Sequence, residues 1–244
     1  MPRDPENQSH FNYIKHNYSL LADIIQWDIK NWSRSLDFWQ SNTKRLSNPA
    51  KMNAVDLGAR NGGISLFLAL QEVNTICSDL TNPEVMAKPL HQRYGLEKLI
   101  EYASIDILDI NSSDKNFDIV VFKSVLGDLG AAEKQVRAIR EILRILKPGG
   151  ECWFAENLKA SFIHQFFRKY FIRWGKQWRY LERDEFIDML QQAGFKEIKY
   201  HCYGFWAVFG RNEWQRRLLS YLDRLTDRLI PDKSKYIIFG IAVK

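Results

Sequence analysis

The sequence predicts an α/β fold in which a mostly parallel sheet of seven strands is flanked by helices. Between residues 51 and 150, short apolar runs alternate with helical patterns, which is typical of a parallel sheet built from repeated β-α-β units. A glycine-bearing turn follows the first of these runs. Two later apolar runs are separated by a long helical stretch, which allows an antiparallel pair of strands at the end of the chain.

Each apolar run has the length of a strand. The expected strands cover residues 52–57, 74–78, 101–105, 117–122, 151–155, 197–203 and 236–243. Residues 131–146 repeat apolar side chains at helical spacing, and the Lys-Pro-Gly-Gly sequence at 147–150 is expected to end that helix before the fifth strand. Residues 183–193 and 211–229 show the same helical spacing.

The segments outside these strands are expected to cover the sheet. Residues 1–48 form an N-terminal helical cap, and residues 49–244 form the main domain with lid insertions near 157–182 and 205–232. The run 162–174 repeats apolar pairs every four residues with basic residues between them, so as a helix it is amphipathic. One interpretation is that its apolar stripe packs on the sheet domain as a lid. The other is that its aromatic and basic groups bind a carrier-linked glycan or contact an anionic membrane surface.

Composition narrows the class of protein. A chain of 244 residues with 45% hydrophobic content can bury one substantial core, and its apolar runs are shorter than a membrane helix. The net charge of +6 is compatible with a phosphate-bearing substrate, an anionic membrane or nucleic acid. The three cysteines lack zinc-site spacing, so we expect buried thiols and no metal. The polar N-terminus has no secretory pattern, which predicts a cytoplasmic protein.

The most informative segment joins the first strand to the next helix. Gly58 and Gly62 lie in this turn, where glycine lets the backbone approach a ligand closely at the carboxyl edge of the sheet. Asp56 precedes the first glycine, and an acid there suits a ligand with a cationic amine better than a pyrophosphate. Asp79 ends the second strand about 20 residues beyond Gly58, the usual offset for a carboxylate that binds ribose hydroxyls. The two acids predict a nucleoside with an amino-acid tail.

Four elements in this order resemble the class I S-adenosylmethionine-dependent methyltransferases. They are the turn 56–63, Asp79, the pair Asp106-Ile107, and the strand 117–121 with the later 146–150. The resemblance spans roughly residues 50 to 156 and implies a Rossmann-like fold with S-adenosylmethionine as cofactor. The chain departs from the family pattern at Arg60, which stands where a second loop glycine is usual.

The resemblance also implies which residues bind the cofactor. They are Asp56, Gly58, Ala59, Gly62, Asp79, Leu80, Asp106, Ile107, Lys123 and Ser124. The glycine turn would face the methionine part, and the residues ending the second strand would face the ribose and adenine. The pair after the third strand would bind the adenine, and the last two residues would line the sulfonium side.

A general base is optional for methyl transfer, because the cofactor carries an activated leaving group and positioning supplies much of the acceleration. A hydroxyl acceptor must still lose its proton, which favours a base near the ends of the fourth and fifth strands. The candidates are Asp128 after the fourth strand, Glu156 at the end of the fifth, and His164 in the first lid. Histidine has the most suitable intrinsic pKa, although a surface position on a lid helix is an equal interpretation.

The leading hypothesis is a small-molecule methyltransferase that methylates an oxygen of a sugar or carrier-linked glycan intermediate. Residues 205–213 resemble methyltransferases of bacterial surface-polysaccharide biosynthesis. The alternatives are an RNA or protein methyltransferase and a noncatalytic S-adenosylmethionine-binding protein. The chain reads Phe-Lys-Ser-Val at 122–125, without an NPPY-like motif, so no nucleic-acid partner is expected. Peripheral membrane contact and the oligomeric state stay open.

Overall fold

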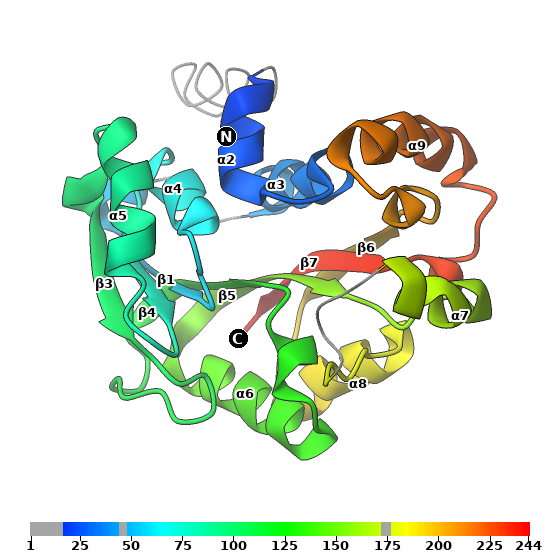
Figure 1. The fold of residues 1–244 in the computed structure, drawn as a ribbon. Coiled ribbons are helices and arrows are strands. Elements are labelled where there is room, and N and C mark those ends of the chain that lie inside the picture. The colour runs from blue at the N-terminus through cyan, green and yellow to red at the C-terminus, as the bar shows by residue number, and fades with distance from the viewer. Residues whose placement is uncertain (1–16, 44–47, 172–176) are drawn as a thin grey trace.

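The computed structural model describes residues 17–43, 48–171 and 177–244. Its centre is a seven-stranded sheet in the order β3-β2-β1-β4-β5-β7-β6, with helices on both faces (Figure 1). The strands are β1 (Asn53–Leu57), β2 (Asn74–Asp79), β3 (Ile100–Ser104), β4 (Phe117–Lys123), β5 (Leu146–Asn157), β6 (Ile198–Tyr203) and β7 (Ile237–Val243). β7 pairs antiparallel with both β5 and β6, whereas the other neighbouring strands pair in parallel. The predicted Rossmann-like fold, with its seven strands, is confirmed.

Eight helices and five short 3-10 turns connect the strands in the described part of the chain. The helices are α2 (Tyr18–Ile25), α3 (Ile29–Asn42), α4 (Gly63–Ala69), α5 (Glu84–Arg93), α6 (Ala132–Ile145), α7 (Phe162–Phe171), α8 (Arg183–Ala193) and α9 (Glu213–Thr226). The 3-10 turns are η1 (Pro49–Lys51), η2 (Glu97–Leu99), η3 (Leu126–Leu129), η4 (Ala207–Phe209) and η5 (Asp232–Ser234). Parts of the expected cap (1–16 and 44–47) and of the first lid (172–176) lie outside the described residues.

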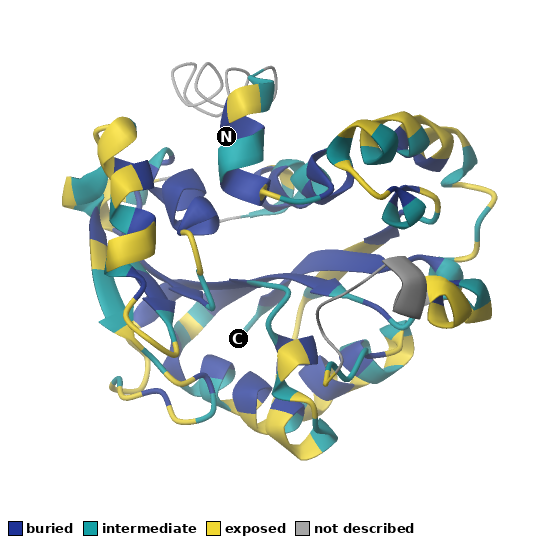
Figure 2. Ribbon diagram, in the orientation of Figure 1, coloured by how far each residue is buried: buried dark blue, intermediate teal, exposed yellow. Residues whose placement is uncertain are grey.

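Alternating strand residues build the core on both faces of the sheet. Val121 and Trp153 point toward α2, α3 and α4, whereas Val120 and Phe154 point toward α6 and α8. All four side chains are fully buried, and Figure 2 shows the central strands of the sheet mostly in the colour of buried residues. A strand that is covered on both faces reads as a continuous apolar run, which is why β4 was visible in the sequence.

The fifth strand begins earlier than the sequence suggested. Leu146 pairs with Phe117, and the next paired residue, Glu151, lies opposite Ile119, so the ladder is irregular between them. Gly149 has a φ of +70°, and its N–H donates to the Lys244 carbonyl at the end of the chain. The sequence 147–150 therefore ends α6 as expected, but it also forms the irregular start of β5 rather than a separate turn.

Helix α3 is fixed across the sheet by aromatic side chains. Trp32, Leu36 and Trp39 share one face because residues three and four apart are neighbours on a helix. Trp39 stacks on Trp153 with ring centroids 5.9 Å apart, and its indole N–H donates to the Gly240 carbonyl at 3.0 Å. Trp32, in the first turn of α3, contacts Lys123 at the carboxyl end of β4.

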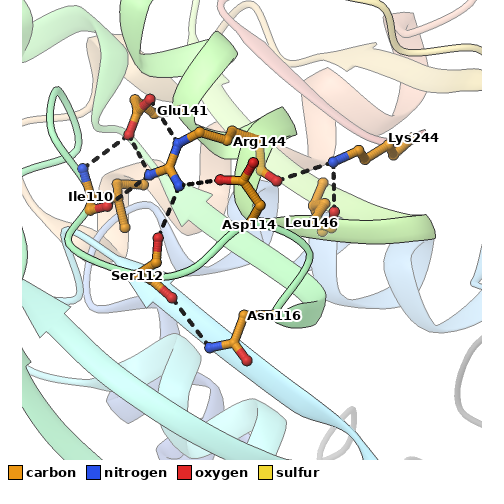
Figure 3. Close-up of polar contacts among 8 residues, drawn as sticks. All are labelled: Ile110, Ser112, Asp114, Asn116, Glu141, Arg144, Leu146 and Lys244. Carbon is orange, nitrogen blue, oxygen red and sulfur yellow. Dashed lines mark hydrogen bonds and ion pairs between the residues drawn. The ribbon is translucent and has the colours of Figure 1, made fainter.

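A cluster of polar contacts around Arg144 fixes the loop after β3 (Figure 3). The guanidinium donates to the carbonyls of Ile110 and Ser112 and to the carboxylates of Asp114 and Glu141, at 2.7 to 3.0 Å. These bonds raise the pKa of Arg144, so it stays charged. The clamped loop carries Asp106 and Ile107, two of the expected cofactor-binding residues.

Candidate active site

The turn between β1 and α4 has the backbone that its glycines predict. Gly58 and Gly62 have φ values of +70° and +74°, in the left-handed region that favours glycine. A Cβ on Gly62 would lie 2.5 Å from Nε2 of His91. The Gly62 carbonyl in turn accepts a hydrogen bond from that ring at 2.9 Å, if Nε2 carries the proton. Ala59 is held by its N–H bond to the Ser78 carbonyl at 2.8 Å.

Arg60 adopts the same left-handed backbone without being a glycine, with a φ of +50°. Its side chain is exposed, and its charge is one of the causes that lower the pKa of Lys123. The turn therefore takes the left-handed conformation at residue 60 although no glycine stands there.

Asp56 is a buried carboxyl beneath this turn. It is 1% exposed, and its Oδ2 accepts a hydrogen bond from the Ser65 hydroxyl at 2.7 Å. Burial raises its pKa to about 7, although the bonds from Ser65 and the charge of Lys123 act in the opposite direction. A cationic group of a ligand at the turn would favour the ionised form of this carboxyl.

Asp79 lies at the edge of the sheet where β2 ends. Its Oδ2 accepts from the Arg60 N–H at 3.0 Å, and its Oδ1 accepts from the Leu80 N–H at 2.7 Å. The carboxylate is half-exposed, so each oxygen keeps a free lone pair for a ligand hydroxyl. Leu80 beside it is 69% exposed and offers an apolar surface next to this acid.

Asp106 and Ile107 follow β3 at the same edge. The Asp106 Oδ1 accepts from the Leu108 N–H at 2.9 Å, whereas the Ile107 side chain is 8% exposed and packs into the core beneath. This pair and Leu80 combine a carboxylate with apolar groups, which is the chemistry that an adenine ring needs. The residues from Asp56 to Ile107 therefore fit S-adenosylmethionine.

Lys123 lies at the centre of the charged groups at the end of β4. Its Nζ is 5.0 Å from the centroid of the Trp32 ring, a cation–π contact. Burial and the charge of Arg60 lower its pKa to about 8, against the opposing effects of Asp56, Glu156 and Asp28. Ser124 follows with a φ of +58°, and its hydroxyl accepts from the Asn157 amide at 2.9 Å.

A polar face of α3 lies beyond Lys123. Asp28 caps this helix and is fully buried, and the Tyr236 hydroxyl donates a hydrogen bond to its Oδ2. Asn31 donates to Tyr236 and to Asp223, each at 2.7 Å. Burial, reinforced by the charges of nearby acids, raises the pKa of Asp28 well above its usual range.

Three buried polar atoms of this face have no hydrogen-bond partner among the described residues. They are Oδ1 of Asp28, Oδ1 of Asn31 and the indole N–H of Trp32. Buried polar atoms are nearly always paired, because an unpaired one costs about 1 to 3 kcal/mol. Residues 28, 31 and 32 share one face of the helix, so these atoms form a candidate acceptor site.

The three candidate bases have different surroundings. Glu156 is buried close enough to Lys123 to influence its pKa, and its oxygens accept from the N–H groups of Val125, Leu126 and Asn157. Burial raises its pKa to about 7. Asp128 is exposed in η3. Each of the three stays a prediction as a catalytic group.

His164 is buried rather than on the lid surface. Its Nδ1 is 2.7 Å from the Ser161 hydroxyl, and its Nε2 is 2.8 Å from the Phe205 carbonyl. Its ring stacks on Phe209 with centroids 5.0 Å apart and lies 6.1 Å from the Tyr236 ring. Tyr236, whose hydroxyl bonds Asp28, therefore lies between His164 and the polar face of α3.

The sequence reasoning missed the polar face of α3. Asp28 and Tyr236 lie 208 positions apart in the sequence, so no local pattern connects them. The local sequence offers no signal either, because Asp23 and Lys30 are other charged residues in the same run as Asp28.

Comparison with known families agrees with this site. Residues 55–154 match the family model described as "Methyltransferase domain". This span contains the glycine turn, Asp79, Asp106 and Lys123.

Known relatives extend the similarity to most of the chain. The ubiquinone/menaquinone biosynthesis C-methyltransferase UbiE of Bartonella tribocorum is 23% identical over 218 residues, which cover 78% of this chain and 80% of that protein. A putative sarcosine dimethylglycine methyltransferase from Galdieria sulphuraria has a TM-score of 0.62 at 16% identity, covering 87% of this chain and 84% of that one. Phosphoethanolamine N-methyltransferase 2 of Haemonchus contortus, solved with S-adenosyl-L-methionine, also has a TM-score of 0.62 at 16% identity. The match covers 98% of this chain and 60% of that one.

Proposed function

We propose that this chain, a class I S-adenosylmethionine-dependent methyltransferase, methylates a hydroxyl-bearing small molecule held between Lys123 and the polar face of α3. The observation that carries the proposal is the set of three unpaired buried polar atoms on Asp28, Asn31 and Trp32. One donor and two acceptors on one helix face match a hydroxyl-rich ligand, which both donates and accepts hydrogen bonds.

We assign different roles to the residues of the site. S-adenosylmethionine, when bound, supplies a methyl group on a sulfonium leaving group. Asp79 would hold the ribose hydroxyls, Asp106 and Ile107 would lie at the adenine, and the turn at Gly58 would leave room for the amino-acid tail. The first turn of α3 orients the acceptor.

Lys123 is the group that we assign to proton transfer. With a pKa of about 8, its amine is partly neutral near physiological pH and accepts the proton that the acceptor hydroxyl loses as the new bond forms. Trp32 covers the amine, and Glu156 and Asp28 favour its charged form after the transfer. Asp28 positions the acceptor through its unpaired oxygen.

A sugar or glycan intermediate is the acceptor that we put forward first. Sugar hydroxyls suit the unpaired donor and the two unpaired acceptors of α3, because a hydroxyl both donates and accepts hydrogen bonds. Methylation then joins the transferred carbon to oxygen.

A carbon acceptor beside a phenolic hydroxyl is the second candidate. The printed name of the Bartonella relative, a C-methyltransferase, favours it. The same base at Lys123 would remove the phenolic proton and increase the electron density of the ring.

The test uses the full chain with methyl-labelled S-adenosylmethionine and separated glycan, lipid, protein and RNA pools. We expect label in a low-molecular-weight or glycan fraction, and NMR of the product then distinguishes an O-methyl from a C-methyl group. The Lys123→Met variant should bind the cofactor but transfer little label. Label in protein or RNA would contradict the small-molecule proposal, and cofactor binding without transfer to any pool would favour a noncatalytic role.

A further inference from the structure

Helix α9 carries an apolar face that points away from the protein. The exposed side chains on it are Trp214, Leu218, Tyr221, Leu222, Leu225 and, one turn beyond the helix, Leu229, each between 44% and 80% exposed. Their spacing of three or four residues places them on one side of the helix. In Figure 2 the outward side of the α9 ribbon is coloured largely as exposed. A continuous exposed apolar stripe of this length marks an interaction surface.

The opposite side of α9 is fixed to the protein by its acids. Both oxygens of Glu213 accept backbone N–H groups, from Asp28 at 3.0 Å and from Ile29 at 2.8 Å. Asp223 accepts from the N–H groups of residues 205–207 at 2.6 to 3.0 Å. These bonds prevent the helix from turning its apolar face inward.

The charge of the outward side is positive. Arg217, Arg224 and Arg228 are exposed along one edge of the apolar stripe. Glu213 and Asp223, the two acids of α9, are bound on the protein side and do not offset these cations at the surface. An apolar face bordered by arginines, with a tryptophan and a tyrosine among the apolar groups, has the composition of a helix that lies in a membrane interface.

We propose that α9 docks this protein on an anionic membrane surface, with its apolar face among the lipid chains and its arginines at the lipid phosphates. The helix would lie in the plane of the surface. No helix in the described ranges has the length and hydropathy to cross a bilayer. The proposal goes beyond methyl transfer and does not depend on it.

The positive charge beside the apolar face of α9 favours an anionic membrane over a second copy of this chain as its partner. Two copies that met through α9 would bring Arg217, Arg224 and Arg228 of each copy to the same interface, where like charges repel. The phosphates of anionic lipids attract the same side chains, with an effect that falls as salt rises.

The experiment measures sedimentation of the full chain with vesicles of phosphatidylglycerol and phosphatidylcholine, and with vesicles of phosphatidylcholine alone. We expect binding to the anionic vesicles at low salt and much weaker binding to the neutral ones. The variant W214S/L225S/L229S should lower the bound fraction about tenfold or more. The matched control is V85S/M86S, because Val85 and Met86 are equally exposed apolar residues on α5. This control should bind as the unchanged protein does.

The arginines are tested separately. R217Q/R224Q/R228Q should weaken binding and reduce its dependence on salt, whereas K196Q/K199Q removes exposed cations elsewhere and should not. Circular dichroism and titration with S-adenosylmethionine check that each variant is folded.

Three results would overturn the proposal. The first is that the unchanged protein fails to sediment with anionic vesicles, and the second is that the serine variant sediments equally well. The third is that the unchanged protein is a dimer by light scattering and the serine variant a monomer, which would assign the face to a second copy.

Discussion

Replacing Asp56 by asparagine should make the unliganded protein more stable at neutral and alkaline pH. The carboxyl is 1% exposed, and burial raises its pKa from 3.8 to about 7. Between these values the folded protein holds a proton that the unfolded chain has lost. The contribution of Asp56 to stability is therefore fully present below pH 3.8 and is lost as the pH rises through 7.

The size of the change in unfolding free energy follows from the pKa shift of Asp56. Three pKa units correspond to about 4 kcal/mol in the free energy of unfolding, and roughly 2 to 3 kcal/mol of this falls between pH 5 and pH 8. Asparagine cannot ionise, yet it keeps an oxygen for the Ser65 hydroxyl. The difference in unfolding free energy, Asp56→Asn minus unchanged protein, should grow by that amount from pH 5 to pH 8.

Urea unfolding followed by circular dichroism, at several pH values and without cofactor, measures this difference. The control is Ser78→Ala, which removes a neutral hydroxyl bonded to the Asp56 carbonyl at 2.8 Å. Its effect on the free energy of unfolding should not depend on pH. A difference for Asp56→Asn that stays flat from pH 5 to pH 8 would refute the burial argument.

Three further predictions concern neighbouring residues. In the unchanged protein, turnover should rise as the pH passes about 8, where Lys123 loses its proton. Lys123→Arg should remove this inflection from the pH profile and lower turnover about 100-fold. Both are measured as the rate of labelled product formation at a series of pH values. Gly62→Ala should lower the free energy of unfolding by about 3 kcal/mol, because its φ is +74° and the new Cβ would meet His91; an unchanged urea midpoint would contradict this. Arg144→Gln should weaken cofactor binding several-fold by releasing the loop that carries Asp106, and equal calorimetric affinity would exclude that coupling.

The fold could be predicted because its signals are local. Buried strands such as β4 read as apolar runs, and the helix α6 shows its apolar face in the sequence. The residues that we expect to bind the cofactor were chosen from signals of the same local kind, because Asp56, Gly62 and Asp79 each lie near the end of a strand or turn.

The site that we propose for the acceptor could not be predicted from the sequence, because its groups come from distant segments. Asp28, Lys123 and Tyr236 lie on α3, on β4 and just before β7, and only the folded chain brings them together. His164 illustrates the same limit, since its burial among Phe205, Phe209 and Tyr236 depends on the position of η4. The outward apolar face of α9 could be detected as a helical pattern, but the pattern alone does not say which side faces solvent.

The most direct measurement of the central claim is calorimetric titration of the full chain with S-adenosylmethionine, for the unchanged protein and for Asp79→Ala. The claim predicts saturable binding at one site per chain, weakened about tenfold or more by loss of the Asp79 carboxylate, which is expected to hold the ribose hydroxyls. An unchanged protein that gives no saturable binding, or an Asp79→Ala variant that binds equally well, would contradict it.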